Sequence, residues 1–177
     1  MIEARALMKS IKQARERAES LGCKYMGGYH NKDVIFVPKG KGRFNLSDDF
    51  VRVRVFIRNN RPTRNAIVIR KRTEFKETGK IDSVVLKEEF DTEKEALAFV
   101  KKSLPGFRKG FEYSREGWEY HLGDKRIFVE DITGYGPSME VEAENEKELK
   151  DLLKKIGAVR IVNESVPEMM RKRLMGE

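Results

Sequence analysis

Residues Arg126–Ala143 read RIFVEDITGYGPSMEVEA, and this stretch decides the fold. Two runs of β-branched and aromatic residues flank a turn that contains Gly134, Gly136 and Pro137, which is the pattern of an antiparallel hairpin. Ser138 is one more turn former, so we expect it at the tip of the hairpin. The stretch therefore predicts two paired strands joined by a short glycine-rich turn.

The positions of the acidic residues make this hairpin unusual. Side chains alternate between the two faces of a strand, so Glu140 and Glu142 share one face of the second strand. On the first strand, Glu130 lies on the same face as Phe128. Glutamate is a poor strand former, so a face with two of them is either solvated surface or a wall that holds a cation. For the hairpin alone, solvated surface is the commoner case.

The composition favours an anionic partner. Lys and Arg together number 37 and Asp and Glu number 29, which gives a formal net charge of +8. Polyphosphate, a nucleotide or nucleic acid would each suit a basic protein, and the charge does not choose among them. A chain of 177 residues fits one domain with a sizeable core.

Two absences in the sequence bear on the compartment. Cys23 is the single cysteine, so an internal disulfide is excluded and a reducing, cytoplasmic compartment is the default. No window approaches the roughly 18 apolar residues that a helix needs to span a bilayer. We therefore expect a soluble cytoplasmic protein without a membrane partner.

Three consecutive segments ahead of the hairpin also alternate as strands do. Arginine and lysine residues stack on one face across the three segments, and like charges on neighbouring strands repel unless an anion or carboxylates lie among them. This makes a purely solvated surface harder to accept for all three together. The segments are Val51–Arg58 with Arg52 and Arg54, Ala66–Arg72 with Lys71, and Val84–Asp91 with Lys87 and Glu89.

Helical spacing and capping residues predict four helices. The first follows a strand that begins at Ile2, and it ends at Gly22. The others begin after Thr92, Asn145 and Ser165, each of which has a glutamate three residues later, as a capping box requires. Helices therefore flank the strands rather than alternate with each of them.

These elements predict an α+β fold in a single domain, residues 1–177. A sheet of at least seven mostly antiparallel strands with hairpin connections curls readily into a barrel. With the charged faces pointing inward, cations would hold a chain of phosphates and carboxylates would hold Mg²⁺ or Mn²⁺. That interior would contain Arg52, Arg54, Lys71 and Lys87 beside Glu3, Glu89, Glu130, Glu140 and Glu142.

A faint internal repeat connects the two ends of the chain. Ile2–Ala4 and Val141–Ala143 each read as apolar residue, glutamate, alanine, and each precedes a predicted helix. The repeat suggests a pseudo-two-fold sheet. In such a sheet Glu3 and Glu142 would occupy equivalent positions and face each other across the interior.

The whole chain resembles the CYTH family, the triphosphate tunnel metalloenzymes, which include class IV adenylyl cyclases and thiamine triphosphatases. Each matching motif is short, and the resemblance lies in their order, spacing and shared strand face. The matches are Met1–Arg5 to Glu-x-Glu-x-Lys, Arg52–Arg54 to Arg-x-Arg, Lys71 to a strand lysine, Lys87–Glu89 to Arg-x-Glu, and Glu130, Gly134–Gly136 and Glu140–Glu142 to an acid, Gly-x-Gly and Glu-x-Glu.

The resemblance implies an eight-stranded antiparallel barrel, or tunnel, with flanking helices that binds a triphosphate with one or two divalent metal ions. It implies roles for eleven residues of this sequence. Phosphate would be bound by Arg52, Arg54, Lys71, Lys87 and Arg115; Mg²⁺ or Mn²⁺ would be bound by Glu3, Glu130, Glu140 and Glu142; Glu89 and Arg5 would be catalytic.

This sequence departs from the family pattern at three positions. Met1 stands where the opening motif has its first glutamate, and Arg5 stands where that motif has lysine. Gly117 follows Arg115 at the position where the family usually has a second basic residue.

The resemblance favours an adenylate cyclase that converts ATP to cyclic AMP and pyrophosphate. One alternative is a triphosphatase that hydrolyses inorganic or thiamine triphosphate. Another is a module that binds polyphosphate or RNA without catalysis, although nucleic acid is not the expected partner because the basic residues alternate with carboxylates. Exposed sheet edges leave room for a homodimer. The RNA-binding alternative would use Arg58, Arg61, Arg64, Trp118 and Arg171–Arg173.

Overall fold

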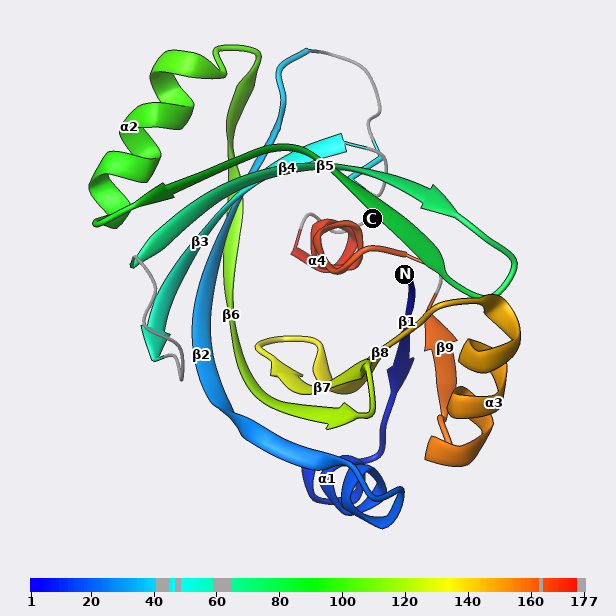
Figure 1. Ribbon diagram of the computed structural model, residues 1–177. Coiled ribbons are helices and arrows are strands. Elements are labelled where there is room, and N and C mark those ends of the chain that lie inside the picture. The colour runs from blue at the N-terminus through cyan, green and yellow to red at the C-terminus, as the bar shows by residue number, and fades with distance from the viewer. Residues whose placement is uncertain (41–44, 47–48, 59–64, 163, 175–177) are drawn as a thin grey trace. The chain divides into compact units, whose positions relative to one another are not determined.

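The computed structural model describes residues 1–40, 45–46, 49–58, 65–162 and 164–174. Within these ranges the chain forms nine strands and four helices, which confirms the α+β class (Figure 1). The elements are β1 (Ile2–Leu7), α1 (Ile11–Ser20), β2 (Lys24–Pro38), β3 (Asp49–Arg58), β4 (Ala66–Phe75), β5 (Lys80–Phe90), α2 (Glu93–Ser103), β6 (Phe107–Leu122), β7 (Lys125–Ile132), β8 (Gly136–Ala143), α3 (Glu146–Ile156), β9 (Arg160–Val162) and α4 (Val166–Leu174).

The strands are hydrogen-bonded in the order β5-β4-β3-β2-β6-β7-β8-β1-β9, and β5 also pairs with β1. The pairs β1–β8, β2–β3, β3–β4, β6–β7 and β7–β8 are all antiparallel, as expected. The described residues contain one strand more than the eight expected. The additional strand is the short β9, which pairs with residues 5–7 of β1.

The contacts within the chain group it into two compact units. The first unit comprises Met1–Tyr29, Glu74–Ile81 and Arg115–Asn163, and the second comprises His30–Thr73, Asp82–Ser114 and Glu164–Glu177. Strands β2, β4, β5 and β6 contribute residues to both units. The single domain expected for residues 1–177 stays a prediction.

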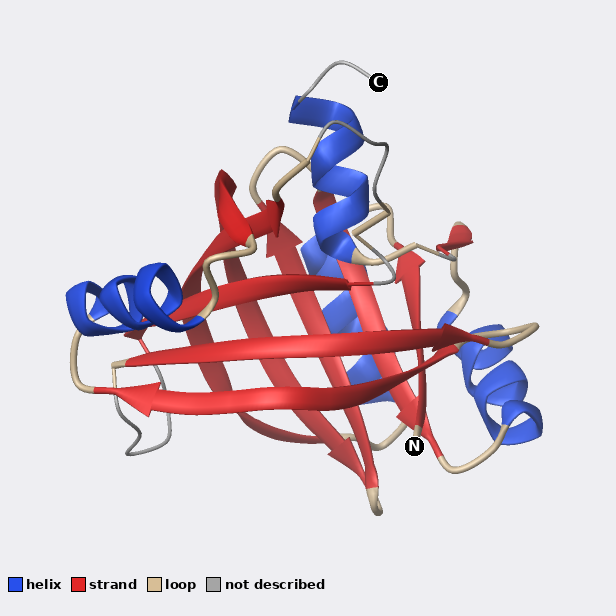
Figure 2. Ribbon diagram, turned by 90° about the horizontal axis from the view of Figure 1, so that it is seen from above, coloured by secondary structure: helices blue, strands red, loops and turns tan. Residues whose placement is uncertain are grey.

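In the first unit, one face of the sheet packs against α1 and α3 (Figures 1 and 2). Alternation places Ala4 of β1, Val129 of β7 and Val141 of β8 in this core, where they meet the apolar sides of the two helices. Both helices begin at the expected type of residue: the Ser10 hydroxyl accepts from the Gln13 amide and the Asn145 side chain accepts from the Glu148 amide. The opposite sheet face is therefore left for polar side chains.

The β7–β8 hairpin forms as expected, with Ile132 opposite Gly136 at its end. Gly134 and Gly136 have φ angles of 80° and 102°, a region that favours glycine. The expected place of Ser138 at the tip is wrong. Because the turn closes before it, Ser138 lies inside β8, fully buried and opposite Glu130.

In the second unit, α2 packs against β3. Val51 and Val53 of β3 lie in a core with Ala96 and Val100 of α2, while Arg52 and Arg54 point to the other face. The capping box predicted at Thr92 is present in full. Helix α4 is joined to the segment before β3, because Glu168 accepts a hydrogen bond from the Leu46 amide at 2.8 Å.

The sequence predicts that no segment spans a membrane, and the length and polarity of the helices bear on this prediction. Among the described residues, every helix is too short or too polar to cross a bilayer.

Candidate functional site

The polar face of the first unit begins with two pairs of charged residues on neighbouring strands. Glu3 of β1 lies directly opposite Glu142 of β8, and Arg5 lies opposite Glu140. The expectation that Glu3 and Glu142 face each other across an interior is therefore wrong. Strands β1 and β8 are hydrogen-bonded to each other, so these two glutamates are neighbours on one face.

Arg5 lies at the centre of this face and is almost fully buried, with 4% of its surface exposed. One terminal nitrogen is 2.8 Å from Oε2 of Glu130 and 2.8 Å from Oγ of Ser138. The other terminal nitrogen is 2.5 Å from Oε2 of Glu140. One guanidinium therefore bridges carboxylates from β7 and β8.

Glu130 receives donors from two further strands. Nη1 of Arg115, on β6, lies 3.1 Å from each oxygen of the Glu130 carboxylate. The hydroxyl of Tyr29, on β2, donates to Oε1 of Glu130 at 2.5 Å. With Arg5, these contacts occupy both carboxylate oxygens of Glu130, which is only 3% exposed.

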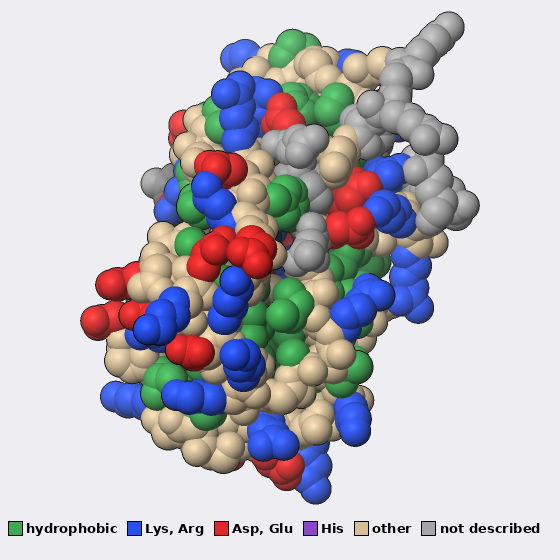
Figure 3. All heavy atoms as spheres, turned by 90° about the vertical axis from the view of Figure 1, so that its right-hand side faces the viewer, with side chains coloured by type: hydrophobic (Ala, Val, Ile, Leu, Met, Phe, Trp, Pro, Cys, Tyr) green, Lys and Arg blue, Asp and Glu red, His purple; other side chains and the backbone are tan. Residues whose placement is uncertain are grey.

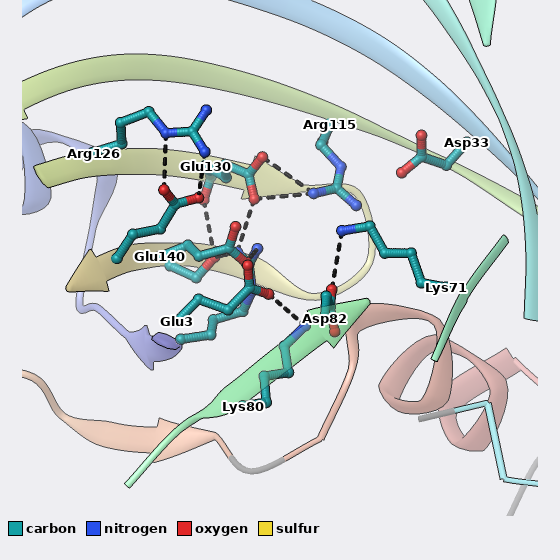
Figure 4. A network of polar contacts seen from close by, with 12 residues as sticks. Glu3, Asp33, Lys71, Lys80, Asp82, Arg115, Arg126, Glu130 and Glu140 are labelled. Atoms are coloured by element: carbon teal, nitrogen blue, oxygen red, sulfur yellow. Dashed lines mark hydrogen bonds and ion pairs between the residues drawn. The ribbon is translucent and has the colours of Figure 1, made fainter. Parts of the chain in front are cut away.

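The two remaining glutamates of the face form ion pairs at its edges. Nζ of Lys80 is 2.5 Å from Oε1 of Glu3. Arg126 binds Glu142 through two nitrogens, at 2.8 and 3.0 Å. Figure 4 shows Lys80 extending toward Glu3. Each of the four predicted metal ligands therefore contacts at least one basic side chain.

The ion pairs shift the pKa values of Arg5 and Glu140. Burial by itself would lower the pKa of Arg5, but the charges of Glu140 and Glu130 raise it above its ordinary value. Burial likewise works to raise the pKa of Glu140, and the charge of Arg5 reverses this, so the pKa falls below 4.5. Arg5 stays charged at every accessible pH, so the Arg5–Glu140 ion pair is lost when Glu140 takes up a proton.

We expect the contribution of Glu140 to folding to disappear in acid. A carboxylate whose pKa is lowered by folding stabilises the protein above its unfolded value, near 4.5, and this stabilisation is lost as the pH falls through the folded value. Urea unfolding at several pH values should show Glu140→Gln less stable than wild type at pH 7, with the gap closing in acid. A gap that stays constant from pH 7 to the most acidic sample would contradict the ion pair.

The position of Gly117 explains the basic residue that is absent there. Gly117 lies opposite Glu130, and a Cβ atom added to it would come within 2.1 Å of Cζ in the Tyr29 ring. The aromatic ring therefore takes the space beside Arg115 that a side chain at residue 117 would need. Tyr29 supplies a hydroxyl donor to Glu130, in addition to the guanidinium groups of Arg5 and Arg115.

The second unit carries its own cluster of basic residues around Asp33, whose side chain is completely buried. Arg54 binds both oxygens of Asp33, at 2.7 and 2.9 Å, and Nη1 of Arg52 lies 3.9 Å from Oδ2. Two arginines thus share one carboxylate. This group of three side chains has a net charge of +1.

Lys71 of β4 lies on the same face of the second unit's strands as Arg52 and Arg54, because it pairs with Phe50 in the register of β3 and β4. Its ammonium is 3.0 Å from Asp82, which also accepts from Thr73 at 2.7 Å. This pair is electrically neutral. Arg72, the next residue, points to the opposite face and is exposed.

Lys87 and Glu89 lie in a different environment. Their side chains are 55% and 50% exposed, and they contact each other at 3.5 Å. By contrast, the side chains of Arg52 and Arg54 are 11% and 18% exposed. The phosphate-binding role of Lys87 and the catalytic role of Glu89 stay predictions.

The structure describes some of the residues expected for RNA binding. Arg61 and Arg64 lie outside the described residues, and Arg58 is exposed. Trp118 packs beside the core of the first unit, with the guanidinium of Arg15 5.4 Å from its ring centroid. On the face displayed in Figure 3, basic and acidic side chains are interspersed. Arg171 and Lys172 form ion pairs with Glu168 and Glu164.

The described carboxylates do not fit a divalent metal centre. In the ranges that the structure describes, no three His, Cys, Asp or Glu side chains come together as a metal site. Glu130 and Glu140 are instead connected by the guanidinium of Arg5. Mg²⁺ and Mn²⁺ require oxygen ligands that are free to coordinate. Here Oε2 of Glu130 and Oε2 of Glu140 already contact the guanidinium of Arg5. The roles of Glu3, Glu130, Glu140 and Glu142 as metal ligands, which the resemblance implied, stay a prediction, and the contacts of these residues do not favour it.

Sequence reasoning missed six polar partners. Only Asp33 carried a local signal, because it shares a strand face with Ile35 and Val37 and so belongs to a largely buried segment. The others depend on which strands pair. The missed residues are Tyr29, Asp33, Lys80, Asp82, Arg126 and Ser138.

Comparison with known proteins found no matching family model and no matching curated protein. Solved structures do match. The PH1819 protein from Pyrococcus horikoshii has a TM-score of 0.77 at 13% identity, covering 99% of both chains. HpAC1, a proposed adenylyl cyclase from Hippeastrum with a dominant triphosphatase activity, has a TM-score of 0.66 at 14% identity, covering 99% of this chain and 95% of its own.

A third match is a proposed adenylate cyclase from Vibrio parahaemolyticus, with a TM-score of 0.65 at 10% identity and 95% of each chain covered. These identities establish the fold and leave the activity open. The chain has a CYTH-like fold, which confirms what the resemblance implied.

Proposed function

We propose that the protein binds a nucleoside triphosphate or another triphosphate on the charged faces of its sheet. The observation that carries this proposal is the group of Arg52 and Arg54 around Asp33, in which two guanidinium groups, 11% and 18% exposed, lie beside one buried carboxylate. Triphosphate-acting proteins among the matches of the same fold support it. The closed eight-stranded barrel implied by the resemblance is part of this proposal.

The arginines suit a phosphate chain by their chemistry. A guanidinium presents a planar fork of N–H donors that matches two phosphate oxygens, and its low hydration suits a buried position. Arg54 already makes such a two-point contact with Asp33. A phosphate oxygen would compete for these donors. The guanidinium groups of Arg52 and Arg54 would attract the anion by their positive charge.

Two reactions are compatible with a triphosphate held by arginines. In a cyclase, a ribose hydroxyl attacks the α-phosphorus and pyrophosphate leaves; in a triphosphatase, water attacks the terminal phosphorus and orthophosphate leaves. In both cases the guanidinium groups would stabilise the charge on the transferred group. The adenylate cyclase is the first candidate reaction. The activity named for the Hippeastrum protein supports the triphosphatase as the second candidate. The need for Mg²⁺ or Mn²⁺ stays a prediction.

Product analysis would separate these reactions. The purified protein would be incubated with ATP, tripolyphosphate and thiamine triphosphate, each with Mg²⁺, with Mn²⁺ and with chelator. Cyclic AMP with pyrophosphate would establish the cyclase, and orthophosphate would establish the triphosphatase. Absence of turnover from every substrate, with triphosphate still raising the melting temperature, would leave a binding protein without catalysis.

Neighbouring residues on opposite faces of β4 give a sharper test of where phosphate binds. We expect Lys71→Met to weaken tripolyphosphate binding by about 10- to 100-fold, because a charge-assisted hydrogen bond contributes about 1.5–3 kcal/mol. Arg72→Met removes the same charge from the exposed opposite face. It should change the Kd less than about threefold, because salt screens the interaction of an exposed charge with a distant phosphate. Calorimetric titration measures both. Equal losses of affinity in the two variants would show that tripolyphosphate does not bind on the face of β4 that carries Lys71.

A further inference from the structure

The place between Glu130 and Glu140 is occupied by a cation that belongs to the chain itself. Arg5 contacts Glu130 at 2.8 Å and Glu140 at 2.5 Å, each through a different terminal nitrogen. Two carboxylates that approach one another need a positive charge between them, or one of them takes up a proton. Here the guanidinium supplies that charge.

The hydrogen bonds of Glu130 also show that cations and donors of the chain itself occupy this place. Oε1 accepts from Tyr29 at 2.5 Å and from Arg115 at 3.1 Å, while Oε2 accepts from Arg5 at 2.8 Å and from Arg115 at 3.1 Å. Coordination of Mg²⁺ or Mn²⁺ requires oxygen lone pairs at about 2.0–2.2 Å from the ion. A metal ion at Glu130 would have to displace at least one of these three donors.

The balance of charges on this face also opposes the binding of a divalent metal ion. Arg5 and Arg115 balance Glu130 and Glu140 within the buried network. At the edges, Lys80 balances Glu3 and Arg126 balances Glu142. A divalent ion added among these groups would bring two uncompensated positive charges next to a buried guanidinium, and such charges are costly to bury.

We propose that the guanidinium of Arg5 is a built-in replacement for a divalent cation, so that the charged face of the first unit takes no metal ion. This inference does not rest on triphosphate binding, because it concerns the metal ion alone.

Titration with Mn²⁺ alone tests the proposal. Free Mn²⁺ is followed by electron paramagnetic resonance as it is added to wild type, Arg5→Met and Arg5→Met/Glu140→Gln. We expect wild type to bind no stoichiometric Mn²⁺ at this face. Arg5→Met should gain one site, because two carboxylates lose their cation, and the double variant should lose that site again.

Two outcomes would overturn the proposal. One is a stoichiometric Mn²⁺ site in wild type that Glu140→Gln abolishes, since Glu140 would then be a metal ligand beside Arg5. The other is folded Arg5→Met that gains no Mn²⁺ site. The comparison of wild type with Glu140→Gln decides the matter even if Arg5→Met does not fold. A melting temperature that Mn²⁺ raises in Arg5→Met but not in wild type would support the proposal independently.

Discussion

Replacing Arg5 by methionine should lower the free energy of unfolding by about 3–5 kcal/mol, which is the usual cost of removing one partner from a buried ion pair. Methionine keeps much of the apolar stem but leaves Glu140 without the cation that lies 2.5 Å away, and it removes one of the donors to Glu130. Domains of this size are stable by about 5–15 kcal/mol. The loss should therefore be plain in urea unfolding followed by circular dichroism.

An exposed ion pair in the same unit provides the control. Lys12 lies 3.9 Å from Glu16 on α1, with side chains 86% and 62% exposed. Lys12→Met should change the free energy of unfolding by less than about 0.5 kcal/mol, as for other surface pairs. Adding Glu140→Gln to Arg5→Met should restore part of the stability, since it removes the unpaired charge. Equal effects of Arg5→Met and Lys12→Met would show that the buried network does not form.

Replacing Gly117 by alanine should destabilise the protein by about 2–4 kcal/mol, from overpacking together with the loss of a buried hydrogen bond. The added methyl group would lie 2.1 Å from Cζ of Tyr29. An aromatic ring cannot yield as the end of a flexible side chain can. Its displacement would break the 2.5 Å hydrogen bond from Tyr29 to Glu130.

Two variants make this prediction specific. Gly106→Ala adds a methyl group where no other atom lies within 4 Å, so it should change stability by less than about 1 kcal/mol in either direction. Tyr29→Ala removes the ring, and Gly117→Ala should then cost much less than it does in wild type. A double-mutant cycle of chemical unfolding measures this coupling. Additive effects of the two substitutions would contradict the packing of Tyr29 against Gly117.

The alternation of side chains accounts for what the sequence could predict. It placed Glu140 with Glu142 and Arg52 with Arg54, because two residues apart on a strand means the same face wherever the strand lies in the sheet. Capping residues such as Thr92 gave the helix starts for a similar local reason. These features depend only on residues that are close in the chain, so they can be predicted without knowing how the strands pair.

The partners of the charged residues could not be predicted in this way. Arg5 and Glu140 are 135 residues apart, and Tyr29 and Glu130 are 101 apart. Their contacts exist because β1 pairs with β8 and because the ring of Tyr29 fits over a glycine. Pairing of distant strands is set by the whole core rather than by local sequence. The ion pairs that these residues form therefore could not be predicted, and their roles as metal ligands and phosphate binders stay predictions.

The most direct test of triphosphate binding is calorimetric titration of tripolyphosphate into the wild-type protein, first in chelator and then in Mg²⁺. The arginines around Asp33 predict saturable binding with one site per chain. If Arg5 replaces the metal ion, that binding should already be present in chelator. Saturation that occurs in Mg²⁺ alone would support triphosphate binding and contradict a metal-free site. No saturable heat in either buffer would contradict the central proposal that this protein binds a triphosphate.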